Sequence, residues 1–226
     1  MNKRRRRPPT GCLIVAEGLD GSGKSATIAQ LGRWLEQRGH VVRVIDWAQS
    51  KAVERAAADP RLRIALTPRV AALIGASEAQ GRIAARITRR LRDGQVVLAE
   101  RYAWTAIARE VARGLDLEWV SNLHRAMPPP DLVLYQRSSA QLAVARALAD
   151  RPPSVQSTAV ASAYGEFAGR LAATFELLVE RTQQGIAAPW TTDLLVLDEA
   201  DPGESARTAW DAVLSLVEGP NGGRAV

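Results

Sequence analysis

The chain has 226 residues, 46% of them hydrophobic, which is enough for one domain with a buried core. No apolar run approaches the ~20 residues of a membrane helix, and the single cysteine, Cys12, excludes an intramolecular disulfide, so we expect no membrane partner and a cytoplasmic location. The formal net charge is +6, and Lys3–Arg7 supplies five of the six charges.

This basic segment is predicted to lie outside the folded domain. Two prolines follow it, and we predict that residues 1–10 form a disordered tail. Because aromatic residues that could stack on bases are absent from it, a solvated extension is favoured and we do not expect nucleic acid as a partner. Residues 219–226, which contain glycine and proline, are predicted to form a flexible C-terminal tail. One domain over residues 11–218 remains.

The domain is predicted to begin with a strand, a glycine-rich loop and a helix. Cys12–Ala16 is a short apolar run typical of a buried strand. After the loop, Ile28, Leu31 and Leu35 recur at helical spacing, and Gly39 stands where a helix C-cap would. The loop therefore joins the end of a strand to the N-terminus of a helix.

The loop itself has the pattern of a phosphate-binding P-loop: Gly18, four residues, then Gly23, Lys24 and Ser25. The helix start offers unpaired N–H groups and a partial positive charge to a phosphate. Lys24 is predicted to reach the β- and γ-phosphates of a nucleotide and Ser25 to ligate Mg²⁺. The predicted nucleotide-binding residues are Gly18, Leu19, Asp20, Gly21, Ser22, Gly23, Lys24, Ser25 and Ala26.

The second predicted strand covers residues 40–46 and ends at Asp46. The carboxyl ends of strands in an open α/β sheet face the ligand crevice, which makes Asp46 a candidate site residue. A turn residue that ends the strand is an equally good interpretation of the same position.

Two helices are predicted between the second and third strands. Residues 51–58 are rich in alanine, and Pro60 follows them as a breaker. Thr67 then precedes a proline in the pattern of an N-cap, and a long helix is predicted from residue 70 to 91. Gly75 and Gly81 inside that helix either weaken it or mark a close approach of another group.

The third predicted strand, Gln95–Ala99, runs directly into Glu100, Arg101 and Tyr102. In a P-loop protein, Glu100 could hold Mg²⁺ directly or through water, and Arg101 could clamp a transferring phosphoryl group. The alternative is a structural ion pair between Glu100 and Arg101 at the strand end. The P-loop favours the functional interpretation.

The remaining elements continue to alternate between helix and strand, and His124 is expected to pack within its helix. Because strands alternate with helices, we predict a P-loop NTPase three-layer α/β sandwich, with a five-stranded parallel sheet, helices on both faces and a short lid. The predicted elements are helices over 105–113 and 117–127, a strand over 131–135, a helix from 139 to 148, a lid over 150–157, a helix over 164–178, a strand over 194–198 and a helix over 204–217.

Three segments share a pattern typical of one family. This chain is similar to thymidylate kinases in three of the segments that characterise that family. They are residues 17–25 (EGLDGSGKS), residues 94–102 (GQVVLAERY), and residues 130–135 (PDLVLY) with 142–146 (LAVAR). These are the P-loop, the Asp-Arg-Tyr strand end, and the fourth strand with its lid-flanking helix. The chain thus resembles the thymidylate kinase family of P-loop nucleotide kinases over roughly residues 10 to 218.

The resemblance implies ATP and Mg²⁺ as cofactors, a central P-loop strand and a homodimer. It implies that Asp20 faces the acceptor's phosphate and the metal, and that Arg101 bridges the donor and acceptor phosphates. Arg146 would lie near the adenine and Arg151 near the transferring phosphoryl group. With Asp46 included as a possible base, the candidate catalytic residues are Lys24, Arg101, Asp20, Asp46 and Arg151, and the candidate metal ligands are Ser25 and Glu100.

The departures from the family pattern concern the acceptor. Residues 46–50 (DWAQS) replace the family's Thr-Arg-Glu-Pro-Gly-Gly, and Glu78 stands where the family has an arginine that helps to hold the nucleotide. Ala106 and Arg109 replace acceptor-contacting residues, and Glu100 replaces an aspartate. The donor half is therefore intact and the acceptor half is different. The candidate acceptor-binding residues are Asp46, Trp47, Glu78, Arg101, Tyr102 and Arg109.

Three functional hypotheses follow. The first is an ATP-dependent phosphotransferase that acts on a nucleoside monophosphate, as a dTMP kinase does. The second is a kinase for a hydroxyl group of a nucleoside or another small metabolite, with Asp46 as general base; the carboxylate at Glu78 favours this version. The third is a nucleotide-binding regulatory protein without transfer activity.

Overall fold

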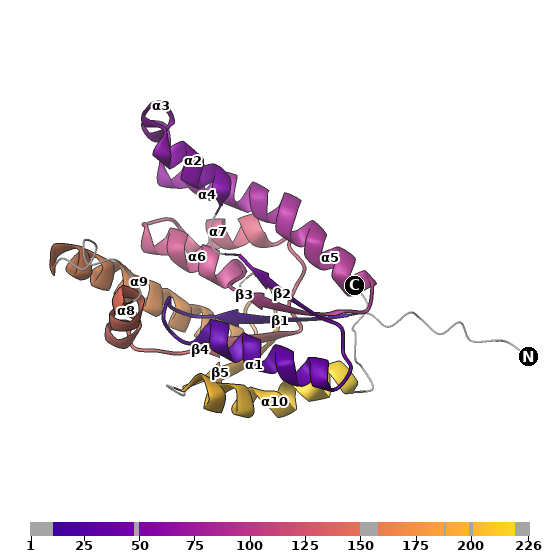
Figure 1. Cartoon of the computed structure of the whole chain (residues 1–226). Coiled ribbons are helices and arrows are strands. Elements are labelled where there is room, and N and C mark those ends of the chain that lie inside the picture. The colour runs from indigo at the N-terminus through magenta and orange to yellow at the C-terminus, as the bar shows by residue number, and fades with distance from the viewer. Residues whose placement is uncertain (1–10, 48–49, 150–157, 188, 199–200, 220–226) are drawn as a thin grey trace, which may run out of the picture.

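The computed structural model describes residues 11–47, 50–149, 158–187, 189–198 and 201–219 (Figure 1). Its centre is a five-stranded sheet in the order β2-β3-β1-β4-β5, with every neighbouring pair parallel. The strands are β1 (Cys12–Glu17), β2 (Val42–Asp46), β3 (Val96–Glu100), β4 (Leu132–Gln136) and β5 (Asp193–Leu197). The predicted parallel α/β sheet with the P-loop strand at its centre is confirmed.

Helices cover both faces of this sheet (Figure 1). On one face, α1 (Lys24–Gln37) and α10 (Pro202–Glu218) pack against each other and against the strands. The remaining helices are α2 (Lys51–Ala58), α3 (Pro60–Arg63), α4 (Pro68–Glu78), the π-helix η1 (Ala79–Ala84), α5 (Ala85–Arg92), α6 (Ala103–Ala112), α7 (Leu117–His124), α8 (Ala140–Ala149) and α9 (Thr158–Gln183). The short helices α2 and α3 project with the start of α4 at the upper left of Figure 1.

Two hydrophobic cores meet at β1, all of whose residues are buried. Leu13 and Val15 belong to the core shared with α5, α6 and α9, whereas Ile14 and Ala16 belong to the core shared with α1 and α10. Successive side chains of a strand point to opposite faces, so a strand covered on both sides must be apolar throughout. This explains the uninterrupted apolar run that predicted the strand, and it places the P-loop rigidly at the sheet's carboxyl edge.

The long helix predicted from residue 70 to 91 is present, but it is not a regular α-helix. α4, η1 and α5 follow one another without a break, and the wider π-turn spans Ala79–Ala84. The suggestion that Gly81 marks a close approach is wrong, because a Cβ there would meet nothing within 4 Å in the described part of the structure. At Gly75 such an atom would lie 4.0 Å from Ser50 Cβ, an ordinary contact.

The predicted N-cap at Thr67 is confirmed, while several helix boundaries differ from the prediction. Thr67 Oγ1 accepts a hydrogen bond from Val70 N at 3.3 Å, as an N-cap does. α6 begins at Ala103, two residues earlier than predicted, and α7 ends at His124, three residues earlier than predicted. α9 spans Thr158–Gln183 and so extends beyond the predicted range of 164–178 at both ends. The early start of α6 depends on a residue of β1 described below, which local sequence patterns do not reveal.

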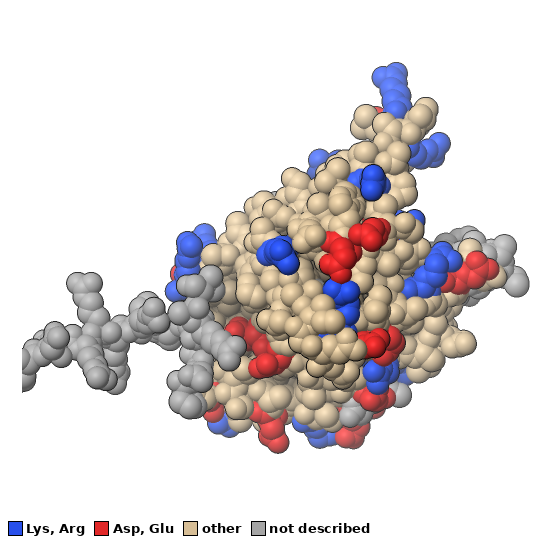
Figure 2. Space-filling model, turned by 180° about the vertical axis from the view of Figure 1, so that it is seen from behind, with Lys and Arg blue, Asp and Glu red and all other residues tan. Residues whose placement is uncertain are grey.

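Three predicted segments lie outside the described residues: the basic tail over 1–10, the lid over 150–157 and nearly all of the C-terminal tail over 219–226. None of the helices that the structure describes is both long and apolar enough to cross a membrane. Figure 2 shows the side of the molecule turned away in Figure 1, where acidic and basic side chains alternate with neutral surface. On that side, the described lysines and arginines do not gather into one basic face of the kind that binds nucleic acid.

Candidate active site

The P-loop lies between β1 and α1 and depends on glycine at two positions. Gly18 has φ +139°, and a Cβ there would lie 2.4 Å from the backbone oxygen of Gln136 on β4. Gly23 has φ +100° and forms the N-cap of α1. Neither conformation suits a residue with a side chain. The loop therefore packs tightly on β4 and leads into the N-terminus of α1, which is a favourable place for an anion.

Lys24 is held inside the loop that it is predicted to serve. Its side chain is buried, and Nζ donates to Leu19 O at 2.5 Å and to Ser22 Oγ at 3.3 Å. Burial, together with the nearby charge of Arg101, lowers the pKa of Lys24 from 10.5 to about 8. The protein therefore stabilises the charged form of Lys24 only in part. A bound phosphate would add a negative charge beside the ammonium group and stabilise that charged form.

Ser25 and Glu100 meet at the carboxyl edge of the sheet. Ser25 Oγ donates a hydrogen bond to Glu100 Oε1 at 2.6 Å, although the residues are 75 positions apart. No group of three or more His, Cys, Asp or Glu side chains suited to a metal exists among the described residues. A hydroxyl and a single carboxylate fit Mg²⁺, which uses one or two protein oxygens and takes its other ligands from water and substrate phosphates. The pair thus fits the predicted Mg²⁺ site.

Arg101 occupies the centre of the site in a strained backbone conformation. Its φ is +61°, the one positive value of a non-glycine residue in the described ranges, and its N–H donates to Ala16 O at 3.0 Å. A non-glycine residue in this region costs roughly 1–3 kcal/mol and is found where the surroundings enforce it. Here the hydrogen bond to β1 helps to fix this conformation, and the side chain reaches Asp20 of the P-loop.

Three carboxylates surround the Arg101 guanidinium. Nε and Nη2 each lie 3.3 Å from Asp20 Oδ1, while Nη1 lies 3.2 Å from Asp46 Oδ1 and 3.3 Å from Glu100 Oε1. Asp20 comes from the P-loop and Asp46 from the end of β2. The arrangement is more than the Glu100–Arg101 pair of the structural alternative, because it draws together the ends of three different segments.

Asp20 also joins this cluster to α6. Its Oδ2 lies 3.5 Å from Nη2 of Arg109. Burial alone would raise the pKa of Asp20, but the charges of Arg109, Arg101 and Lys24 outweigh burial and hold the pKa below its usual value. Asp20 is therefore an anion at neutral pH, and the two arginines Arg101 and Arg109 converge on it.

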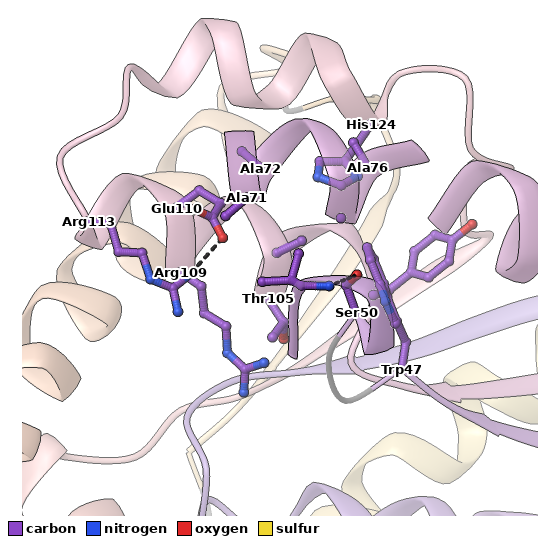
Figure 3. A pocket seen from close by; sticks show the side chains of 14 residues that line it. Trp47, Ser50, Ala71, Ala72, Ala76, Thr105, Arg109, Glu110, Arg113 and His124 are labelled. Atoms are coloured by element: carbon purple, nitrogen blue, oxygen red, sulfur yellow. Dashed lines mark hydrogen bonds and ion pairs between the residues drawn. The ribbon is translucent and has the colours of Figure 1, made fainter. Parts of the chain in front are cut away.

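A pocket opens beside this cluster, between α4 and α6 (Figure 3). Trp47, Tyr102 and Arg109, all predicted as acceptor-binding residues, line it. Trp47 packs edge-on against Tyr102 and against His124, with ring centroids 6.3 and 5.8 Å apart. The structure thus brings together predicted residues that are distant in sequence.

Glu78 has a different environment. Its Oε2 accepts a hydrogen bond from Ser50 Oγ at 2.5 Å and lies 3.4 Å from Ala52 N, at the start of α2. The carboxylate thereby supports the N-terminus of a helix. Arg146 lies in α8, and Arg151 falls outside the described residues. The predicted roles of these three residues stay predictions.

Glu17 is a residue of the site region to which the sequence analysis gave no role of its own. It is 1% exposed and accepts hydrogen bonds from Trp104 N at 2.9 Å, Thr105 N at 3.1 Å and Thr105 Oγ1 at 2.5 Å. Burial raises its pKa from 4.5 to about 7, against the lowering effect of these bonds and of Lys24. The sequence signal that could have revealed Glu17 is a carboxylate at the end of an otherwise apolar strand.

Comparisons with known proteins agree with this geometry. The family model described as thymidylate kinase matches residues 16–181. The chain is similar to "Probable thymidylate kinase 2" of Saccharolobus solfataricus, with 34% identity over 136 residues that cover 60% of this chain and 63% of the relative. It is also similar to "Probable thymidylate kinase" of Thermococcus gammatolerans, with 33% identity over 133 residues that cover 55% of this chain and 64% of the relative. The protein of the same name from Pyrobaculum aerophilum is 30% identical over 143 residues, which cover 59% of this chain and 68% of the relative. The chain thus spans just under two thirds of the first two relatives.

Proposed function

This chain belongs to the thymidylate kinase family, and from that premise we propose that it transfers the γ-phosphoryl group of ATP to the phosphate of a nucleoside monophosphate. The named relatives are probable thymidylate kinases, which makes dTMP the reference acceptor. The observation that carries the proposal is the position of Arg101. Its strained backbone holds a planar cation between the P-loop and the end of β2, where donor and acceptor phosphates would meet.

Such a reaction needs alignment and charge neutralisation more than proton transfer. The acceptor phosphate is already anionic, so no general base is required. Arg101 would contact the phosphates of both substrates, and Lys24 would exchange its contact with Leu19 O for phosphate oxygens. Ser25 and Glu100 would hold Mg²⁺, which neutralises charge on the phosphate oxygens when it is bound. Asp20 orients Arg101 and Arg109 in the absence of substrate.

The geometry favours this reaction over the other two hypotheses. A hydroxyl kinase would need Asp46 as a free base, but its carboxylate already pairs with Arg101 at 3.2 Å. A regulatory nucleotide binder would need only the P-loop, and it would gain nothing from an arginine held in a strained conformation opposite that loop.

The test is an acceptor panel. The full chain is incubated with ATP and Mg²⁺ and with nucleosides or their monophosphates, and ADP formation is measured. We expect turnover with monophosphates only, and its loss when EDTA removes Mg²⁺. Turnover with nucleosides alone would establish the hydroxyl kinase instead. Binding of ATP without transfer to any acceptor would establish the regulatory protein.

The variant Arg101→Lys tests the role of the arginine itself. Lysine keeps the charge but lacks the planar fork that reaches several oxygens at once. We expect kcat to fall at least about tenfold while KM for ATP changes little, because the lost contacts are made in the transition state. Arg33→Lys, on the exposed side of α1, is the matched control and should keep full activity. An unchanged kcat in Arg101→Lys would remove Arg101 from the mechanism.

A further inference from the structure

A groove lined by arginines lies between the edge strand β2 and α5 (Figure 1). β2 pairs with β3 on one side, and its other side carries no strand in the described sheet. Four arginines line the groove, one from β2 and three from α5: Arg43, Arg86, Arg89 and Arg90. Spacings of three and four residues from Arg86 place the α5 arginines on one face of the helix. Two elements therefore bring four guanidinium groups to one surface, which we call the arginine groove.

The arginine groove has no carboxylate partner among the described residues. Elsewhere on the surface, Arg38 pairs with Glu218 at 2.8 Å and Arg137 with Asp198 at 2.9 Å. Arg43 Nη1 donates to a backbone oxygen of its own strand at 2.9 Å, and this bond leaves its charge uncompensated. The described protein therefore does not neutralise the groove through ion pairs.

α5 concentrates positive charge in a chain that is otherwise nearly neutral. Four of its eight residues are arginine and none is acidic. Outside Lys3–Arg7, the charges of the chain nearly cancel. The acidic residues at the ends of β2 and α5 are Asp46, which pairs with Arg101, and Asp93, the C-cap residue. Cations in a last helical turn offset the helix dipole, but that explanation does not extend to Arg43 on a strand. The arrangement is typical of a surface for an anionic partner.

The start of the described chain lies next to this surface. Gly11 N donates a hydrogen bond to Leu91 O at 2.7 Å, so the described chain begins beside α5. Lys3–Arg7 carries five further positive charges, and Arg7 is four residues before Gly11. At no more than about 3.6 Å per residue, covalent geometry keeps Arg7 within about 14 Å of Gly11. The basic segment by itself gave no reason to expect nucleic acid, but its attachment point beside the arginine groove does.

We propose that the arginine groove and the basic segment Lys3–Arg7 form a surface for double-stranded nucleic acid, which is bound through its phosphates without regard to base sequence. The planar guanidinium group of arginine matches phosphate oxygens in pairs. A concave surface suits the projecting phosphate rows of a duplex better than the flat headgroup layer of a membrane. None of the described residues that line the groove is aromatic, which favours a duplex over stacking on the bases of a single strand.

The arginine groove is separate from the candidate active site. Arg43 is aligned with Val97 in the sheet, whereas the site residues Asp46 and Glu100 are aligned with each other at the carboxyl edge. The contact of Gly11 with α5 lies before the first residue of β1, at the amino edge. The inference therefore does not depend on the proposed function, and binding alone tests it.

The test is a titration of the full chain with a fluorescein-labelled DNA duplex, followed by anisotropy at several NaCl concentrations. Each phosphate contact contributes about −0.9 to the slope of log Kobs against log salt concentration. The triple variant Arg86→Gln, Arg89→Gln, Arg90→Gln should weaken binding at least about tenfold and reduce the size of the slope by about 3. The matched control changes three exposed arginines of α1 and α3, as Arg33→Gln, Arg61→Gln, Arg63→Gln, and should keep the wild-type slope. An equal loss in the control would overturn the inference, because net charge alone would then explain binding.

A second set of measurements separates the strand, the segment and the class of partner. Arg43→Gln should reduce the slope by about 1. A chain without residues 1–7 should bind more weakly, and its remaining binding should still depend on the α5 arginines. A wild-type slope in both Arg43→Gln and the triple variant would overturn the inference. Binding to vesicles of phosphatidylserine and phosphatidylcholine, without binding to the duplex, would also overturn it and assign the surface to a membrane.

Discussion

Glu17 illustrates how a single residue can connect the P-loop strand with the helix that carries Arg109. Its carboxylate, at the end of β1, accepts the hydrogen bonds that cap α6. Tyr102 occupies the N-cap position of this helix, but its side chain makes no capping hydrogen bond. Because the carboxylate is buried, its pKa is raised to about 7, and its protonation depends on whether the chain is folded.

This difference predicts a pH-dependent contribution to stability. The unfolded chain loses the Glu17 proton near pH 4.5 and the folded chain near pH 7, so the contribution is fully present below pH 4.5 and is lost as pH rises through 7. Its upper size is about 3 kcal/mol. The free energy of unfolding, measured in denaturant from pH 5 to 8, should therefore decline in the wild type relative to Glu17→Gln. Glu36→Gln, in which an exposed carboxylate is changed, should follow the wild type, and a constant difference between wild type and Glu17→Gln would refute the assignment.

Residues of the site were predictable where chemistry follows a local pattern. Lys24, Ser25 and Arg101 came from motifs that place a cation or a hydroxyl at a strand end, and the structure brings all three to one edge of the sheet. Glu110 and His124 were not recognised as pocket residues, because they belong to two different helices, α6 and α7, and only the fold brings them to one cavity.

At the scale of elements, the P-loop depends on backbone conformation as well as on side chains. Gly18→Ala should destabilise the chain by more than the ~1–2 kcal/mol expected for left-handed strain alone, because the new Cβ would lie 2.4 Å from Gln136 O. Nucleotide binding should be lost with it. Gly185→Ala is the matched control, since its φ is +72° but nothing lies within 4 Å of a Cβ in the described structure.

Denaturant unfolding and calorimetric titration with ATP and Mg²⁺ measure the two effects. The control variant should lose stability modestly and bind the nucleotide normally. If Gly18→Ala matched Gly185→Ala in both measurements, the explanation that Gly18 is required for close packing of the loop on β4 would be refuted.

Element types were predictable from periodicity, while some boundaries were not. The strands follow apolar runs that must be buried on both faces, as for β1 and β3. The early start of α6 escaped prediction because its cap comes from β1, and the π-turn at Ala79–Ala84 leaves the apolar spacing of the surrounding helix nearly unchanged.

At the scale of the whole molecule, the homodimer expected from the family resemblance stays a prediction, and one surface is suited to it. α3, the residue that follows it and α4 expose several large apolar side chains, among them Ile64 at 88% and Leu73 at 50%. Such groups on neighbouring helices often mark an interface. Light scattering should give twice the chain mass of 24.4 kDa, and Leu73→Glu should reduce the mass to that of one chain. Ile186→Glu, an exposed isoleucine elsewhere, should not. A single-chain mass for the wild type would exclude the dimer.

The way in which α6 begins also has a consequence for the order of folding. Glu17 and Thr105 are 88 residues apart in the chain, so their contact closes a long loop. The first turn of α6 can be capped only after β1 has taken its place beside β3, since no local side chain caps it. We therefore expect helix formation at this point to follow sheet assembly. Mutations in the first turn of α6 should then mainly accelerate unfolding, whereas mutations in the β1–β3 pair should slow the folding step itself.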